Sequence, residues 1–111
     1  MKRIEIYISP LHLEALKDRL RMIAIPGMTV HDVLAVAAQP HEIVYRGATS
    51  KADMVPRLRV DIVVPDDWVE GVITATLHAI GKTEQPGGHI LITPVDEVIR
   101  IRTGEMGPDA I

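Results

Sequence analysis

The chain has 111 residues, a formal net charge of −3 and no cysteine, and 47 % of its residues are hydrophobic while only 3 % are aromatic. This length and hydrophobicity predict one domain with a core of its own, and the lack of cysteine excludes disulfides and thiolate metal sites. The acidic balance and the few aromatic rings argue against nucleic acid as a partner, and no apolar stretch approaches the roughly 20 residues that a helix needs to cross a bilayer, so we expect a cytoplasmic protein without membrane insertion.

The first third of the chain predicts a strand, a helix and a second strand. Residues 3–8 alternate isoleucines with polar side chains, which is the period of a half-buried strand. Ser9 and Pro10 then supply a helix cap and a favoured first helical residue. Leucines at helical spacing follow until a Pro-Gly pair ends the helix, and a valine-rich strand is expected over 28–36.

Residues 37–55 show no clean hydrophobic period, and only 42–46 could form a short strand. Segments of this length without structure are unusual in a compact domain and are commonly functional. We therefore expect a long mobile loop here.

The second half repeats the pattern of strand and helix. Apolar and polar residues alternate over 58–64, and a helix follows that Gly81 would stop. A turn-rich loop over 82–88 precedes a short strand at 89–92, and a last strand is expected over 98–102.

The order strand, helix, strand, strand, helix, strand, with one added short strand, predicts an α+β fold of the ferredoxin-like βαββαβ type over the single domain 1–111. Both helices then cover one face of the sheet. Because the outward residues of the other face are not all polar, we expect the protein to self-associate.

Two arginines near the C-terminus are the first candidates for ligand binding. Arg100 and Arg102 alternate with isoleucines, so on a strand both guanidinium groups would leave the same face, roughly 7 Å apart. Two forked donors at that separation suit adjacent phosphates. The alternative is a pair of solvated arginines that contact carboxylates.

A second candidate is the glycine-containing loop that ends in Gly87, Gly88 and His89. Glycines let backbone N–H groups approach an anion, although the lysine of a P-loop is missing here and an ordinary turn is the alternative. The five histidines lack the spacing of a helical zinc pair, so we expect no metal site. No nucleophile and base can be assembled, which favours a binding protein over an enzyme.

Five short segments occur in an order and spacing that cover nearly the whole chain. They are Met1-Lys2-Arg3-Ile4-Glu5, Pro26-Gly27-Met28-Thr29-Val30, Tyr45-Arg46-Gly47-Ala48, Val63-Val64-Pro65-Asp66-Asp67 and Ile99-Arg100-Ile101-Arg102-Thr103-Gly104-Glu105. Together they resemble the PII signal-transduction family. The resemblance implies a homotrimer of ferredoxin-like subunits in which 37–55 is the T-loop, 82–89 the B-loop and 103–111 the C-loop.

The resemblance also implies that ATP, ADP or AMP binds in clefts between subunits. The residues that it assigns to the nucleotide are Thr29, Asp61, Val63, Gly87, Gly88, His89, Arg100 and Arg102. A second group, assigned to an effector and to the T-loop, is Ala38, Gln39, Arg46, Ser50 and Arg57. Gln39 matches a glutamine that helps to hold Mg²⁺ and 2-oxoglutarate in the family.

The chain departs from the family pattern in these loops. His89 stands where a lysine is usual, which argues for a less highly charged nucleotide such as ADP or AMP. Ser50 replaces a modifiable tyrosine, which excludes uridylylation there and leaves phosphorylation of Ser50 or Thr49 open. Arg57 replaces the lysine that pairs with 2-oxoglutarate and keeps the charge but not the geometry.

We therefore expect a regulator rather than an enzyme, in which a bound adenine nucleotide orders 37–55 and this loop engages a transporter or an enzyme. Three alternatives stay open. One is a PII-like sensor of bicarbonate, linked to carbon fixation or bicarbonate transport, with the small anion near Arg46, Arg57 or the nucleotide cleft. The others are a small hydrolase of phosphate esters or acyl phosphates on the same fold and a trimer whose loops bind only metal or protein.

Overall fold

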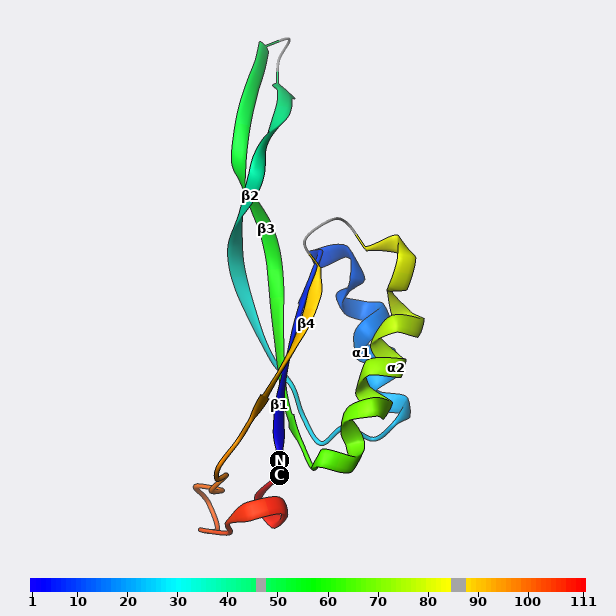
Figure 1. The fold of residues 1–111 in the computed structure, drawn as a ribbon, viewed down its shortest axis with the longest axis vertical. Helices are drawn as coiled ribbons and strands as arrows, with labels where there is room; N and C mark the ends of the chain where they lie inside the picture. The colour runs from blue at the N-terminus through cyan, green and yellow to red at the C-terminus, as the bar shows by residue number, and fades with distance from the viewer. Residues whose placement is uncertain (46–47, 85–87) are drawn as a thin grey trace.

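The computed structural model describes residues 1–45, 48–84 and 88–111, and over 37–45 and 48–53 it describes the backbone alone. In this part of the chain four strands form one antiparallel sheet in the order β2-β3-β1-β4. The strands are β1 (Lys2–Ile8), β2 (Thr29–Tyr45), β3 (Ala48–Val64) and β4 (His89–Pro94). Helices α1 (Leu13–Met22) and α2 (Val69–Ala79) lie together on one side of the sheet (Figure 1). The predicted α+β fold is confirmed.

The core is aliphatic and lies between the sheet and the two helices. Every second residue of β1 points into it, because side chains alternate between the two faces of a strand. The half of β3 that pairs with β1 does the same. The largest fully buried side chains are Ile4, Ile6, Ile8, Leu16, Leu20, Val60, Ile62, Val64 and Val72.

Short 3-10 turns lead into both helices. Ser9 has extended backbone angles, its Oγ accepts a hydrogen bond from the Leu11 N–H at 3.4 Å, and Pro10 opens the turn η1 (Pro10–His12) before α1. This agrees with the predicted cap. The turn η2 (Asp66–Trp68) precedes α2 in the same way, and η3 (Gly81–Thr83) follows it.

The second and third strands run much further than the sequence pattern indicates. The expectation of an irregular loop over 37–55 is wrong for the described residues, because β2 continues to Tyr45 and β3 begins at Ala48. Their pairing is continuous apart from a register shift between Val36 and His41. We call residues 37–45 and 48–55 the arm. The backbone groups between the two strands pair with each other whatever the side chains are, so such a hairpin can form without a hydrophobic period.

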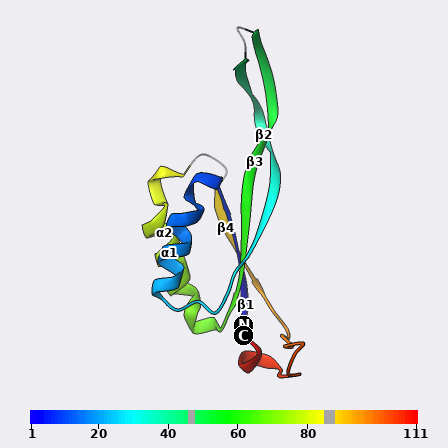
Figure 2. The same ribbon diagram turned by 180° about the vertical axis from the view of Figure 1, so that it is seen from behind.

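The arm gives the molecule its elongated shape, with extents of 57 × 26 × 21 Å. In Figure 1 it rises above the sheet and the helices, and the view from behind in Figure 2 shows it clear of them again. Both termini lie at the opposite end of the molecule (Figure 1).

The predicted last strand over 98–102 is wrong. Beyond β4, Ile99 forms only an isolated bridge with Met106, and the chain turns back within a few residues. The Gly104 N–H donates to the Arg100 carbonyl at 2.8 Å, and Gly104 has a φ of 73°, in the region that favours glycine. The alternation of Ile and Arg has the period of a strand, but among the described residues of one chain it pairs with no strand and forms only the isolated bridge of Ile99 to Met106.

Candidate functional site

Three residues that the family resemblance assigns to a nucleotide line one cavity of about 330 Å³. Thr29 of β2 lies directly opposite Asp61 of β3, and Val63 lies two residues further along the same face of β3. The remaining lining residues come from the segment before β2 and from the C-terminal segment. They are Pro26, Gly27, Met28, Val98, Ala110 and Ile111. Segments far apart in the sequence therefore meet at this cavity.

Asp61 provides the charge in the wall of this cavity. Its Oδ2 lies 3.1 Å from His31 Nε2 and its Oδ1 lies 3.3 Å from Arg59 Nε. Both Asp61 Oδ1 and Arg59 Nε are buried and lack a well-aligned hydrogen bond to any described residue. Burial acts to lower the pKa of Arg59, but the nearby Asp61 carboxylate and Tyr7 hydroxyl outweigh it and raise that pKa above its ordinary value. The Asp61 carboxylate is therefore held between two basic side chains, His31 and Arg59.

Gly88 and His89 line a different cavity, of about 270 Å³, beside β4 and α2. The imidazole ring of His89 stacks on Tyr7, with 4.7 Å between the ring centroids. Glu84 also lines this cavity, which shares no residue with the one at Asp61. Gly87 belongs to the segment 85–87, outside the described residues.

The two C-terminal arginines do not project side by side from a strand, because no strand forms there. Arg100 donates from Nη2 to the Ile111 carbonyl oxygen at 3.1 Å, and its Nη1 lies 3.7 Å from Glu105. Arg102 is exposed in the turn that follows Arg100. Through Ile111, Arg100 adjoins the cavity at Asp61.

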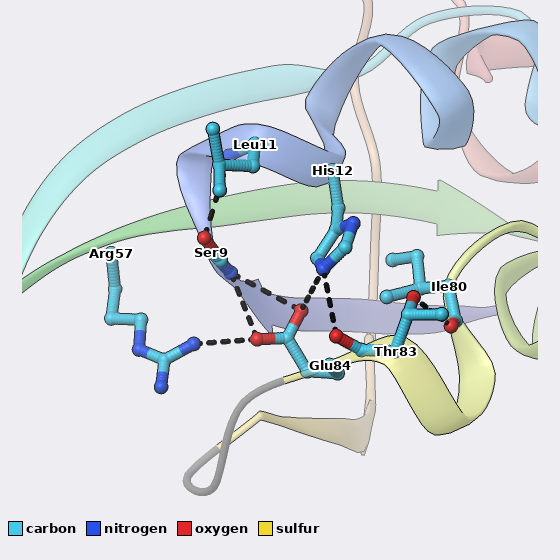
Figure 3. Close-up of polar contacts among 7 residues, drawn as sticks. All are labelled: Ser9, Leu11, His12, Arg57, Ile80, Thr83 and Glu84. Atoms are coloured by element: carbon cyan, nitrogen blue, oxygen red, sulfur yellow. Dashed lines mark hydrogen bonds and ion pairs between the residues drawn. The ribbon is translucent and has the colours of Figure 1, made fainter.

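A third cluster surrounds the carboxylate of Glu84 (Figure 3). Arg57 is only 6 % exposed, and its Nη1 lies 2.6 Å from Glu84 Oε1. The backbone N–H of Ser9 donates to both oxygens of Glu84, at 3.1 and 3.2 Å. His12 Nε2 lies 3.8 Å from the same carboxylate and 3.3 Å from the Thr83 carbonyl oxygen. We call Ser9, His12, Arg57 and Glu84 the Glu84 cluster.

Sequence reasoning singled out Arg57 but missed Glu84 as its partner. The two residues are 27 positions apart, and no spacing rule connects the base of a hairpin to the end of a helical turn. The only signal was that the family resemblance marked Arg57 as an effector residue and placed Glu84, of opposite charge, in the B-loop.

The other predicted effector residues lie on or beyond the arm. Ala38 and Gln39 fall within the register shift of β2, and Ser50 pairs with Ile43, in a region where only the backbone is described. Arg46 lies outside the described residues. Within the described ranges, no group of three acidic or histidine side chains is placed to hold a metal ion, and no helix has the length and apolarity to span a bilayer.

Comparison with known proteins gives one consistent answer. The family described as "Nitrogen regulatory protein P-II" matches residues 1–105. Relatives of that name are 39 % identical over 113 residues in Cereibacter sphaeroides and 40 % identical over 112 residues in Azospirillum brasilense. A third, in Haemophilus influenzae, is 38 % identical over 112 residues, and all three alignments cover the full length of both chains. The chain therefore belongs to the nitrogen regulatory protein P-II family of signal-transduction regulators.

Proposed function

We propose that this family member binds an adenine nucleotide between the subunits of a homotrimer and uses the arm to control a transporter or an enzyme. The observation that supports the nucleotide site best is the cavity at Thr29, Asp61 and Val63. Its largely apolar wall suits a base, and the Asp61 side chain, held by His31 and Arg59, adds one charged group to that wall.

A site shared between subunits follows from the separation of the proposed contacts. Within one chain, Asp61 and His89 line cavities that have no residue in common, and Arg102 lies in an exposed turn. One nucleotide would contact all three regions only if a second copy of the chain supplied some of them. Ile101, beside Arg102, is fully exposed, which supports a contact of this segment with another subunit.

The arm is the part of the molecule that we expect to change conformation when such a site binds its ligand. β2 and β3, which carry Thr29 and Asp61 in the cavity wall, are the same strands that continue into the arm. The arm stands clear of the rest of the molecule (Figure 2), and its outer edges carry backbone groups that a partner could pair with. A ligand that binds one arm conformation better than another would shift the population toward that conformation.

The nucleotide site is tested by calorimetric titration of ADP into the wild type and into the double variant Arg100→Ala/Arg102→Ala. We expect the variant to lose at least about tenfold in affinity, because two charge-assisted phosphate contacts are removed. The matched control is Arg19→Ala/Arg21→Ala, which removes two arginines from α1 and should leave the affinity unchanged. An ADP affinity that is equal in all three proteins would rule out the proposed role of the C-terminal arginines.

A further inference from the structure

The Glu84 cluster has the composition of an anion-binding site. A buried guanidinium from Arg57, the backbone N–H of Ser9 and the imidazole of His12 converge on one carboxylate (Figure 3). Guanidinium groups and backbone N–H groups are the donors that proteins commonly use for carboxylates, phosphates and other small anions. Here the anion that they hold is part of the chain itself.

The surrounding structure is shaped to the side chain of Glu84. A Cβ placed on Gly88 would lie 2.4 Å from Glu84 Cγ and 3.3 Å from the Tyr7 carbonyl oxygen. A side chain at position 88 would therefore compete for space with the side chain of Glu84. Glu84 itself is only 13 % exposed, so its carboxylate is held inside the fold.

The cluster also joins three separate segments. Ser9 follows β1, Arg57 lies in β3 opposite Val33 at the base of the arm, and Glu84 follows η3. A single carboxylate therefore connects the residue after η3 with the base of the arm.

We propose that Glu84 is a built-in ligand of Arg57 and that it closes this anion site to small external carboxylates and to bicarbonate. An anion that binds Arg57 Nη1 must displace Glu84, which competes as a tethered group at high effective concentration. Displacement would also separate Glu84 from the base of the arm. Residue 84 thus determines which anions the protein accepts at Arg57, whether or not a nucleotide binds elsewhere.

The test is chemical rescue of Glu84→Ala. This variant lacks the carboxylate and gains space beside Gly88, so Arg57 Nη1 and the Ser9 N–H lose this acceptor and an external anion of the same chemistry can replace it. We expect 100 mM formate to raise the melting temperature of Glu84→Ala by about 4 °C or more above that in 100 mM chloride, because formate binds the folded state alone. The wild type and the control variant Glu14→Ala, changed at an exposed glutamate of α1, should melt at the same temperature in both salts.

A second variant covers the case in which Glu84→Ala does not fold. Glu84→Gln preserves the shape of the side chain and removes its charge, and we expect calorimetry to show at least a tenfold gain in formate affinity over the wild type. Equal responses of the variants and the wild type to formate would overturn the proposal. The ADP titration described above is a separate measurement, so a failure of nucleotide binding and a failure of the Glu84 proposal are distinguishable.

Discussion

At the scale of single residues, the close contact between Gly88 and the side chain of Glu84 explains why a glycine suits position 88. Gly88 was singled out from the sequence because glycine lets N–H groups approach an anion, but the structure gives this residue a second role. Its missing side chain leaves room for Glu84, which holds Arg57 in place. The same carboxylate accepts the Ser9 N–H, so one glycine allows several contacts between distant segments.

Gly88→Ala is therefore expected to destabilise the protein by about 1–3 kcal/mol, because the new methyl group forces Glu84 away from its partners. The measurement is the free energy of unfolding in urea. Gly27→Ala is the matched control, since a Cβ there meets no atom within 4 Å. It should change stability by no more than about 0.5 kcal/mol. Equal losses in both variants would contradict this explanation.

At the scale of elements, periodicity predicted those strands that have one buried face. Ile4, Ile6 and Ile8 alternate with outward residues because the helices cover one side of β1, and this burial creates the pattern. The arm lies away from the core, so burial imposes no such pattern on 37–45, and apart from a possible short strand over 42–46 its strands were not predicted. The converse error occurred at 98–102, where the alternation is present but no strand is available for pairing.

The sequence could place candidate site residues relative to one another only where they lie on the strands that it predicted. Thr29, Asp61 and Val63 were placed at a common site by family resemblance, and the pairing of β2 with β3 brings them to one cavity. The pairing of Arg57 with Glu84 was not predictable, because it depends on how the end of α2 packs over the sheet. Sequence spacing carries no information about that arrangement.

The contribution of the core can be measured with two equivalent truncations in the same region of the chain. Leu20 is completely buried on α1, whereas Leu11 in η1 is 84 % exposed. Leu20→Ala should lower the free energy of unfolding by about 2–5 kcal/mol through lost burial and a new cavity, and Leu11→Ala by less than about 0.5 kcal/mol. Denaturant titrations of the two variants check this, and similar losses would mean that α1 does not pack as described.

At the scale of the whole molecule, one chain leaves much apolar surface uncovered. The described residues include several large apolar side chains that are at least half exposed around the C-terminal segment. They are Ile99, Ile101 and Met106. A segment that lacks a strand partner and exposes such side chains is expected to find its neighbours in another copy of the chain, in agreement with the proposed homotrimer.

Ile101→Gln should therefore weaken the trimer, because it replaces an apolar side chain that we expect to be buried between subunits. Sedimentation velocity over a dilution series is expected to show dissociation at a concentration at least about tenfold higher than for the wild type. Met22→Gln, changed at an exposed residue at the end of α1, is the control and should dissociate as the wild type does. Identical behaviour of the two variants would place the subunit contact elsewhere.

The uninterrupted passage of β2 and β3 from the cavity wall into the arm has a thermodynamic consequence. If a ligand in the cavity favours one conformation of the hairpin, a protein that binds this conformation must raise the affinity for the ligand. The factor is the same as that by which the ligand raises the affinity for the protein. The coupling through the arm would then act in both directions, from the cavity to the target protein and from the target protein to the cavity. The coupling free energy is therefore the same whether the target protein is titrated in the presence of the small molecule or the small molecule in the presence of the target protein.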